Sequence, residues 1–196
     1  MADHKIITIS RTFGSGGRAI GEKLSKELGI SFYDKNLLHL MSEKTGISED
    51  GLENADEKLL NRFIDPYAII SGQDHSTNLY LYRIEKKIIL DLVEKESCVI
   101  VGRLADWILK DDPRVLKVFI TAPEKDRIAR IMEYEKVSQR EAEKLMRQVD
   151  KLRRNYYSFF TDGKWMDFGN RDIILNSSLK GIDGTVEILK YIAQMP

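Results

Sequence analysis

Short runs of apolar, mostly β-branched residues recur along the chain, and most are followed by a stretch with helical periodicity. In the first run, residues 5–10, Ile6, Ile7 and Ile9 are almost continuous, which is typical of a strand covered on both faces. Similar runs predict further strands at residues 30–33, 98–101, 115–121 and 172–175.

Helical periodicity separates these strands. Ile20, Leu24 and Leu28 recur every four residues, and Gly29 is placed to end that helix. Ser or Thr followed three residues later by Glu forms a capping box, and this pattern occurs at residues 121–124 and 138–141. Further helices are predicted over residues 79–96, 124–133, 138–157 and around 186–193, with a polar loop at 71–78.

The alternation of short strands and helices predicts an α/β fold, in which a parallel sheet carries helices on both faces. With 196 residues, four prolines and no low-complexity linker, the chain is expected to form one domain. Ligands of such sheets bind beyond the carboxyl ends of the strands. Residues that directly follow a predicted strand are therefore the first candidates for function.

Composition and charge limit the kinds of molecule that this protein is expected to bind. Lys and Arg together number 31, as do Asp and Glu, so net charge gives no reason to expect binding to nucleic acid or to a membrane. The single cysteine, Cys98, lies in an apolar run and is expected in the core, which fits a reduced, cytoplasmic setting. No apolar run reaches transmembrane length, and the N-terminus lacks a signal-peptide pattern.

A glycine-rich loop joins the first strand to the first helix, and it consists of Phe13, Gly14, Ser15, Gly16, Gly17 and Arg18. Glycines let backbone N–H groups converge on a phosphate, and the helix N-terminus adds its dipole. The simpler interpretation is a tight turn without a ligand, but three glycines in four residues exceed what a turn requires. The loop is therefore predicted to bind the phosphates of a nucleotide.

This loop departs from the Walker A pattern, G-x-x-x-x-G-K-[ST]. Aligned on Gly16, that pattern would place its lysine at Gly17 and its hydroxyl residue at Arg18. Arg18 and Arg11 are the candidate replacements for the lysine charge. No metal ligand can be assigned from the sequence.

Several arginines on later helices are candidates because phosphoryl transfer depends on positioning and on neutralising phosphate charge. Arg127 and Arg130 are three residues apart on one predicted helix. Arg147, Asp150 and Arg153 repeat at the same spacing on the next. A solvated face with surface ion pairs is the alternative for both helices.

Two further candidates come directly after predicted strands. Arg103 comes after the apolar run at 98–101, separated from it only by Gly102. An arginine so close to the end of a buried strand is hard to explain as an ordinary solvent-exposed residue. Asp34 follows the short run at 30–33 and is either a substrate contact or the N-cap of the next helix.

Together these stretches resemble the cytidylate kinase-like family of P-loop nucleoside monophosphate kinases. The resemblance rests on residues 6–18, 32–35, 99–103, 150–157 and 176–178, and it spans nearly the whole chain. It implies a P-loop nucleoside-kinase-like fold around a five-stranded parallel sheet. It also implies a single domain, residues 1–196. The core of this domain would be 1–33, 79–133 and 161–196. A monophosphate-binding segment would lie at 34–78 and a lid at 134–160.

The resemblance also implies roles for the candidate residues, with ATP as the phosphoryl donor and Mg²⁺ as the metal ion that accompanies it. The implied catalytic cations are Arg18, Arg127, Arg130 and Arg153. The implied ATP-binding residues are Arg11, Phe13, Gly14, Ser15, Gly16, Gly17 and Arg18. The implied substrate-binding residues are Asp34, Arg103, Arg147 and Asp150.

The predicted function is ATP-dependent phosphorylation of a nucleoside monophosphate, with a pyrimidine such as CMP as the first choice. Two alternatives stay open. One is a non-catalytic nucleotide-binding module or sensor, since the Walker lysine is absent, and the other is a kinase for another small acceptor on the same fold. Nucleotides are the expected partners, and a homo-oligomer is left open.

Overall fold

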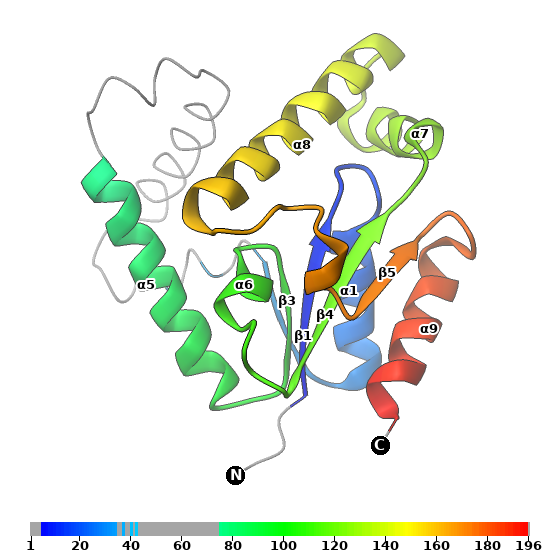
Figure 1. Cartoon of the computed structure of the whole chain (residues 1–196). Helices are drawn as coiled ribbons and strands as arrows, with labels where there is room; N and C mark the ends of the chain where they lie inside the picture. Colours follow the sequence, from blue (N-terminus) through cyan, green and yellow to red (C-terminus); the bar gives the residue numbers. More distant parts are fainter. Residues whose placement is uncertain (1–4, 35–36, 38–39, 41, 43–74, 196) are drawn as a thin grey trace.

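The computed structural model describes residues 5–34, 37, 40, 42 and 75–195 (Figure 1). The monophosphate-binding segment predicted at 34–78 lies mostly outside the described residues. The five predicted strands are all present, and they form one sheet in the order β2-β3-β1-β4-β5. Their bounds are Ile6–Arg11 for β1, Ser31–Tyr33 for β2, Cys98–Val101 for β3, Val115–Thr121 for β4 and Ile173–Asn176 for β5.

Every neighbouring pair of strands in this sheet is parallel. Strand β1 lies at the centre, because it pairs with β3 on one side and with β4 on the other. The loop that follows β1 therefore emerges in the middle of the carboxyl edge of the sheet, where ligands of parallel sheets bind.

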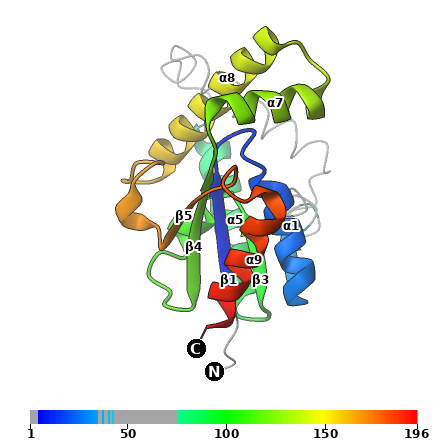
Figure 2. The same cartoon turned by 90° about the vertical axis from the view of Figure 1, so that its right-hand side faces the viewer.

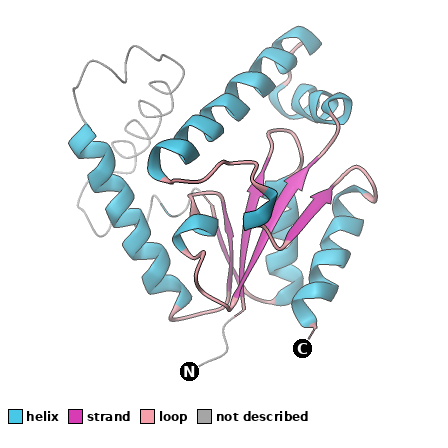
Figure 3. Ribbon diagram, viewed as in Figure 1, coloured by secondary structure: helices cyan, strands magenta, loops and turns pink. Residues whose placement is uncertain are grey.

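Helices cover both faces of the sheet, as Figures 2 and 3 show. On one face, Ile20 and Leu24 of α1 (Gly17–Leu28) and Val186 and Leu189 of α9 (Gly181–Gln194) pack against apolar residues of β1, β3 and β4. On the other face, α5 (His75–Val93) and the short α6 (Ala105–Ile108) cover the sheet. The predicted α/β fold with helices on both faces is confirmed.

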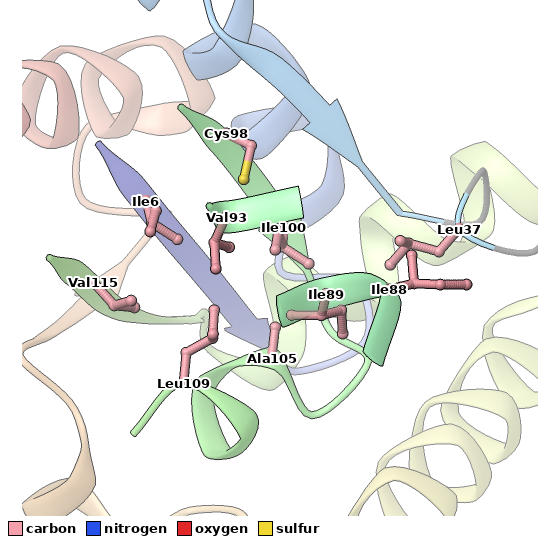
Figure 4. Packing of buried hydrophobic residues seen from close by; sticks show 10 residues of the cluster. All are labelled: Ile6, Leu37, Ile88, Ile89, Val93, Cys98, Ile100, Ala105, Leu109 and Val115. Carbon is pink, nitrogen blue, oxygen red and sulfur yellow. The ribbon is translucent and has the colours of Figure 1, made fainter. Parts of the chain in front are cut away.

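The α5 face is an apolar cluster, shown in Figure 4. Its members come from β1, β3, β4, α5 and α6 and from positions near them: Ile6, Leu37, Ile88, Ile89, Val93, Cys98, Ile100, Ala105, Leu109 and Val115. Burial raises the pKa of the Cys98 thiol to about 12. At neutral pH this side chain is thus a protonated core residue, in agreement with the sequence-based interpretation.

Two helices, α7 (Glu124–Glu135) and α8 (Gln139–Phe160), lie above the carboxyl ends of the strands (Figure 1). Ile131 of α7 packs with Ala142 and Met146 of α8, and Phe13 of the glycine loop packs against them. A short 3-10 helix, Phe168–Asn170, then leads into β5. None of the described helices is long and apolar enough to cross a membrane.

Two details of the sequence-based prediction were wrong. Helix α5 already includes His75, inside the predicted loop at 71–78, because short polar residues disfavour a helix only weakly and do not prevent one. The capping box predicted at 121–124 does not form, because Thr121 stays in β4, paired with Asn176, and Pro123 is the N-cap of α7. The capping box of Ser138 and Glu141 is present.

Candidate phosphate-binding site

The glycine loop crosses from the end of β1 into α1. Gly14 and Gly16 have φ angles of 76° and 78°, in the left-handed region that glycine adopts without steric cost. Ser15 tightens the loop by donating its hydroxyl and its N–H to the carbonyl of Thr12, at 2.8 and 3.3 Å. The result is a tight curl that ends at a helix N-terminus.

The N-terminus of α1 is open. Within the described part of the chain, no side chain caps it, and its first turn contains no acidic residue. The free N–H groups of a first turn and the helix dipole together favour an anion. This end of α1 is therefore suited to a phosphate group.

Arg11 fills the space that a Walker lysine would need. A Cβ atom added to Gly17 would lie 2.6 Å from Cβ of Arg11, and one added to Gly102 would lie 2.0 Å from its Nη1. Both distances are far below van der Waals contact, so the Arg11 side chain depends on glycine at both positions. Burial lowers the pKa of Arg11, Asp34 opposes this effect, and Arg103 and Arg18 add to it.

Asp34 brings two of these cations together. Its buried carboxylate accepts a hydrogen bond from Nε of Arg18 at 2.7 Å and lies 3.9 Å from Nη2 of Arg11. The Arg18 side chain is nonetheless 64% exposed, whereas Arg11 is mostly buried. Of the two candidate replacements for the lysine, Arg11 is therefore the one held inside the protein.

Arg103 lies in an unusual turn after β3. Gly102, Arg103 and Leu104 have φ angles of 77°, 58° and 54°, and such values in two consecutive residues other than glycine store backbone strain. The Arg103 guanidinium faces the buried carboxylate of Glu85 on α5, with 3.4 Å between Nη1 and Oε1. The turn thus fixes a cation between the end of β3 and α5.

Helices α7 and α8 place further arginines on the backbone of the loop. Nε of Arg127 donates to the carbonyl of Phe13 at 2.6 Å, and Nη1 of Arg153 donates to the carbonyl of Arg11 at 2.9 Å. Arg127 also pairs with Asp150, whose Oδ1 accepts the N–H of Phe13 at 2.8 Å. Burial, followed by the charge of Arg11, lowers the pKa of Arg153 to about 9, so this side chain is a cation at neutral pH.

Arg130 connects the loop to the end of β5. Its Nη1 donates to the carbonyl of Gly14 at 3.3 Å and to Oγ of Ser177 at 3.1 Å. Ser177 in turn donates its hydroxyl to the carbonyl of Ser15 at 2.7 Å. The loop is thereby tied to the strand on the far side of β4.

Arg147 lies apart from this group. Its side chain is 74% exposed on α8, and its nearest ion-pair partner is Glu143, at 3.9 Å between Nη2 and Oε2. Its role in substrate binding stays a prediction. All other predicted site residues lie around the loop.

The charges around the loop are unbalanced. Among the described residues, the guanidiniums that converge there belong to Arg11, Arg18, Arg103, Arg127, Arg130 and Arg153, and the carboxylates within ion-pair distance of them belong to Glu22, Asp34, Glu85 and Asp150. The whole chain has equal numbers of acidic and basic residues. Local arrangement has therefore concentrated positive charge at one edge of the sheet, where a polyanion would be attracted.

Residues 6–179 match the sequence profile of the cytidylate kinase-like family. The chain belongs to that family. Relatives named cytidylate kinase, from Thermococcus kodakarensis and Pyrococcus horikoshii, are each 24% identical to it. The first alignment covers 94% of this chain and 86% of the relative, and the second covers 96% and 88%.

Solved structures share the fold of this cytidylate kinase-like chain. A crystal structure of an uncharacterized protein from Eubacterium ventriosum superposes with a TM-score of 0.74 and 29% identity, over 98% of this chain and 100% of that chain. Shikimate kinase from Bacteroides thetaiotaomicron superposes with a TM-score of 0.54 and 15% identity, over 97% and 99% of the two chains.

Sequence reasoning assigned no role to two residues of this candidate site. Ser177 lies in the stretch 176–178 that carries part of the family resemblance, but the pattern alone gives it no partner. Glu85 lies three residues before Ile88 and seven before Leu92, so helical spacing places it on the apolar side of its helix, but the spacing does not show which cation it meets there. Only the packing of α5 on the sheet brings it to Arg103.

Proposed function

We propose that this protein transfers the γ-phosphoryl group of ATP to a nucleoside monophosphate, with CMP as the first candidate acceptor. Family membership supports nucleotide kinase activity, and the relatives named cytidylate kinase support CMP. The proposal rests mainly on one observation, which is the position of Arg11 beside the open N-terminus of α1.

Arg11 supplies the missing charge in this proposal. In a Walker A loop, a lysine reaches the β- and γ-phosphates. Here a lysine at position 17 would collide with Arg11, so the Arg11 guanidinium is the replacement that the packing allows. A guanidinium suits this task because it stays charged and can bind two phosphate oxygens at once.

The other residues take complementary roles. The N–H groups of Gly14 and of residues 16–18 bind the donor phosphates, and Arg18 approaches them from the solvent side. Arg127, Arg130 and Arg153 neutralise charge on the phosphoryl group during transfer. Asp34 and Arg103 lie beyond β2 and β3, the side of the sheet on which we place the acceptor.

Magnesium is expected to bind as a complex with ATP. A magnesium ion commonly takes phosphate oxygens, water and only one or two carboxylates. Among the described residues there is no cluster of three or more His, Cys, Asp or Glu side chains that would hold a metal ion, and Asp34 and Asp150 are both engaged by arginines. We therefore assign no protein residue to the metal.

A coupled assay for ADP release tests the proposal. Purified protein, ATP and magnesium are mixed with each nucleoside monophosphate in turn, and an incubation without acceptor corrects for hydrolysis. ADP released at a higher rate with CMP than with the other monophosphates is the expected result. Nucleotide binding without ADP release for any acceptor would favour the non-catalytic module instead.

A second candidate function follows from the shared fold. Shikimate kinase has the same fold at 15% identity, so a small hydroxylated acceptor other than a nucleotide is the alternative substrate. The same assay with shikimate and related polyols separates the two. If ADP is released with such an acceptor and not with monophosphates, that acceptor takes the place of CMP as the proposed substrate.

A further inference from the structure

One ion pair binds both backbone polar groups of Phe13, the first residue of the glycine loop. The N–H of Phe13 donates to Oδ1 of Asp150 at 2.8 Å, and the carbonyl of Phe13 accepts from Nε of Arg127 at 2.6 Å. Oδ2 of Asp150 pairs with Nη2 of Arg127 and so closes the arrangement. The two successive peptide groups that flank the Phe13 Cα are therefore both bound by one pair of side chains.

This contact joins parts of the chain that are far apart in sequence. Asp150 is 137 residues from Phe13 and belongs to α8, whereas Arg127 is 114 residues from it and belongs to α7. Asp150 is 9% exposed and Arg127 is 7% exposed. Water thus competes little for these hydrogen bonds, and charge-assisted bonds in such surroundings are stronger than neutral ones.

Both carboxylate oxygens of Asp150 are already bound to the protein. The family resemblance implied that Asp150 binds substrate. In the structure, one oxygen faces the Phe13 N–H and the other faces Arg127.

We propose that Asp150 is a positioning residue for the donor side of the site, which fixes the start of the glycine loop and the guanidinium of Arg127. This inference rests on the proposed function, because it concerns the same site. Loop N–H groups bind a phosphate well only if their directions are set in advance. Without Asp150, the Phe13 N–H loses its acceptor and Arg127 becomes an uncompensated buried charge.

Kinetics distinguish a positioning residue from a substrate contact. The variants are Asp150→Ala, which removes both oxygens, and Asp150→Asn, which keeps an oxygen that can accept the Phe13 N–H. We expect Asp150→Ala to raise KM for ATP by about tenfold or more and Asp150→Asn by about fivefold, as for loss of charge-assisted hydrogen bonds. KM for the monophosphate is expected to stay unchanged in both variants.

Asp172→Asn is the matched control. Asp172 also accepts a backbone N–H, that of Lys117, at 2.7 Å, but it lies where β4 and β5 begin, at the opposite edge of the sheet. Both Michaelis constants are expected to stay unchanged in this variant. A raised KM for the monophosphate with an unchanged KM for ATP in the Asp150 variants would return Asp150 to the acceptor site and overturn the proposal.

Amide hydrogen exchange tests the same idea without any activity. In nucleotide-free protein, the Phe13 amide is expected to exchange faster in Asp150→Ala, to a smaller extent in Asp150→Asn, and at the wild-type rate in Asp172→Asn. If Asp150→Ala does not fold, Asp150→Asn carries both tests. Unchanged exchange at Phe13 would overturn the positioning role, whereas a wild-type protein that phosphorylates no acceptor would contradict only the proposed function.

Discussion

Two buried arginine–aspartate pairs, Arg127–Asp150 and Arg171–Asp106, contact different parts of the protein. Arg127 and Asp150 bind the backbone of Phe13 in the glycine loop. Arg171 and Asp106 are buried even more deeply, with 1% and 2% of their side chains exposed. Arg171 lies over the rings of Phe119 and Tyr157, at 5.9 and 5.6 Å from its Cζ to the ring centroids.

The comparison shows that burial of an ion pair does not by itself indicate a functional site. In both pairs, opposite charges are buried away from water, which costs free energy unless each charge keeps its partner. What separates them is the group that each pair contacts. Arg127 contacts backbone that can face a ligand, whereas Arg171 donates to the carbonyls of Trp165 and Asn170 and holds the segment that leads into β5.

Breaking the Arg171 pair should have the largest effect on stability. Arg171→Met leaves the Asp106 carboxylate buried without a counter-charge, and we expect the free energy of unfolding to fall by about 3–5 kcal/mol. Urea denaturation followed by circular dichroism measures this change. The affinity for ATP, measured by calorimetry on the folded variant, should not change, and a clear loss would mean that this pair also supports the site.

Double variants that neutralise both members of a pair test whether only the Arg127–Asp150 pair supports ATP binding. Asp106→Asn added to Arg171→Met removes the lone charge and should restore much of the lost stability. Asp150→Asn combined with Arg127→Met should likewise fold, yet bind ATP about 10- to 100-fold more weakly, as for loss of about 1.5–3 kcal/mol of charge-assisted hydrogen bonding. Equal ATP affinities in the two double variants would remove the distinction between the pairs.

Gly102→Ala tests the space around Arg11. The φ angle of 77° costs alanine about 1–2 kcal/mol, and the new methyl group would displace the Arg11 guanidinium. Gly29→Ala is the control, because Gly29 has a φ of 65° but open space around its added Cβ. Both variants should lose similar stability in urea, and only Gly102→Ala should weaken ATP binding.

Arg18→Ala should have the smallest effect. Its side chain is largely exposed although its partner Asp34 is buried, so solvent screens the Arg18 charge and we expect a loss of about 1 kcal/mol or less in ATP binding. Calorimetry at low and high salt measures this loss, which should shrink as salt screens the charge. Lys26→Ala, which removes an exposed cation of the same helix, is the control.

Local patterns in the sequence were sufficient to predict the sheet and the glycine loop. The strands are continuous apolar runs, and the three glycines and the following helix are neighbours in sequence, so their relation does not depend on the rest of the fold. The capping box of Ser138 and Glu141 was predictable for the same reason.

Contacts between distant elements were not predictable. The spacing of Arg147, Asp150 and Arg153 placed all three on one helix face, but residues at this spacing point in directions that differ by about 60°. Asp150 and Arg153 reach the loop, while Arg147 stays in solvent. The sequence does mark the buried side of α8, since Ala142, Met146 and Asp150 recur every four residues. That this side meets the glycine loop depends on the packing of α8 with Ile131 of α7, and no local pattern encodes that.

The long sequence separations around the loop have a consequence for biosynthesis. The loop receives its bonds from Asp150, Arg153 and Ser177, which follow their partners by 137, 142 and 162 residues. At about 5–20 residues per second, the ribosome needs roughly 7 to 30 seconds to add the first of these separations. In the proposed function, ATP can therefore stabilise the complete site only after Ser177 has been translated, and shorter fragments lack the bonds that Asp150, Arg153 and Ser177 supply to the loop.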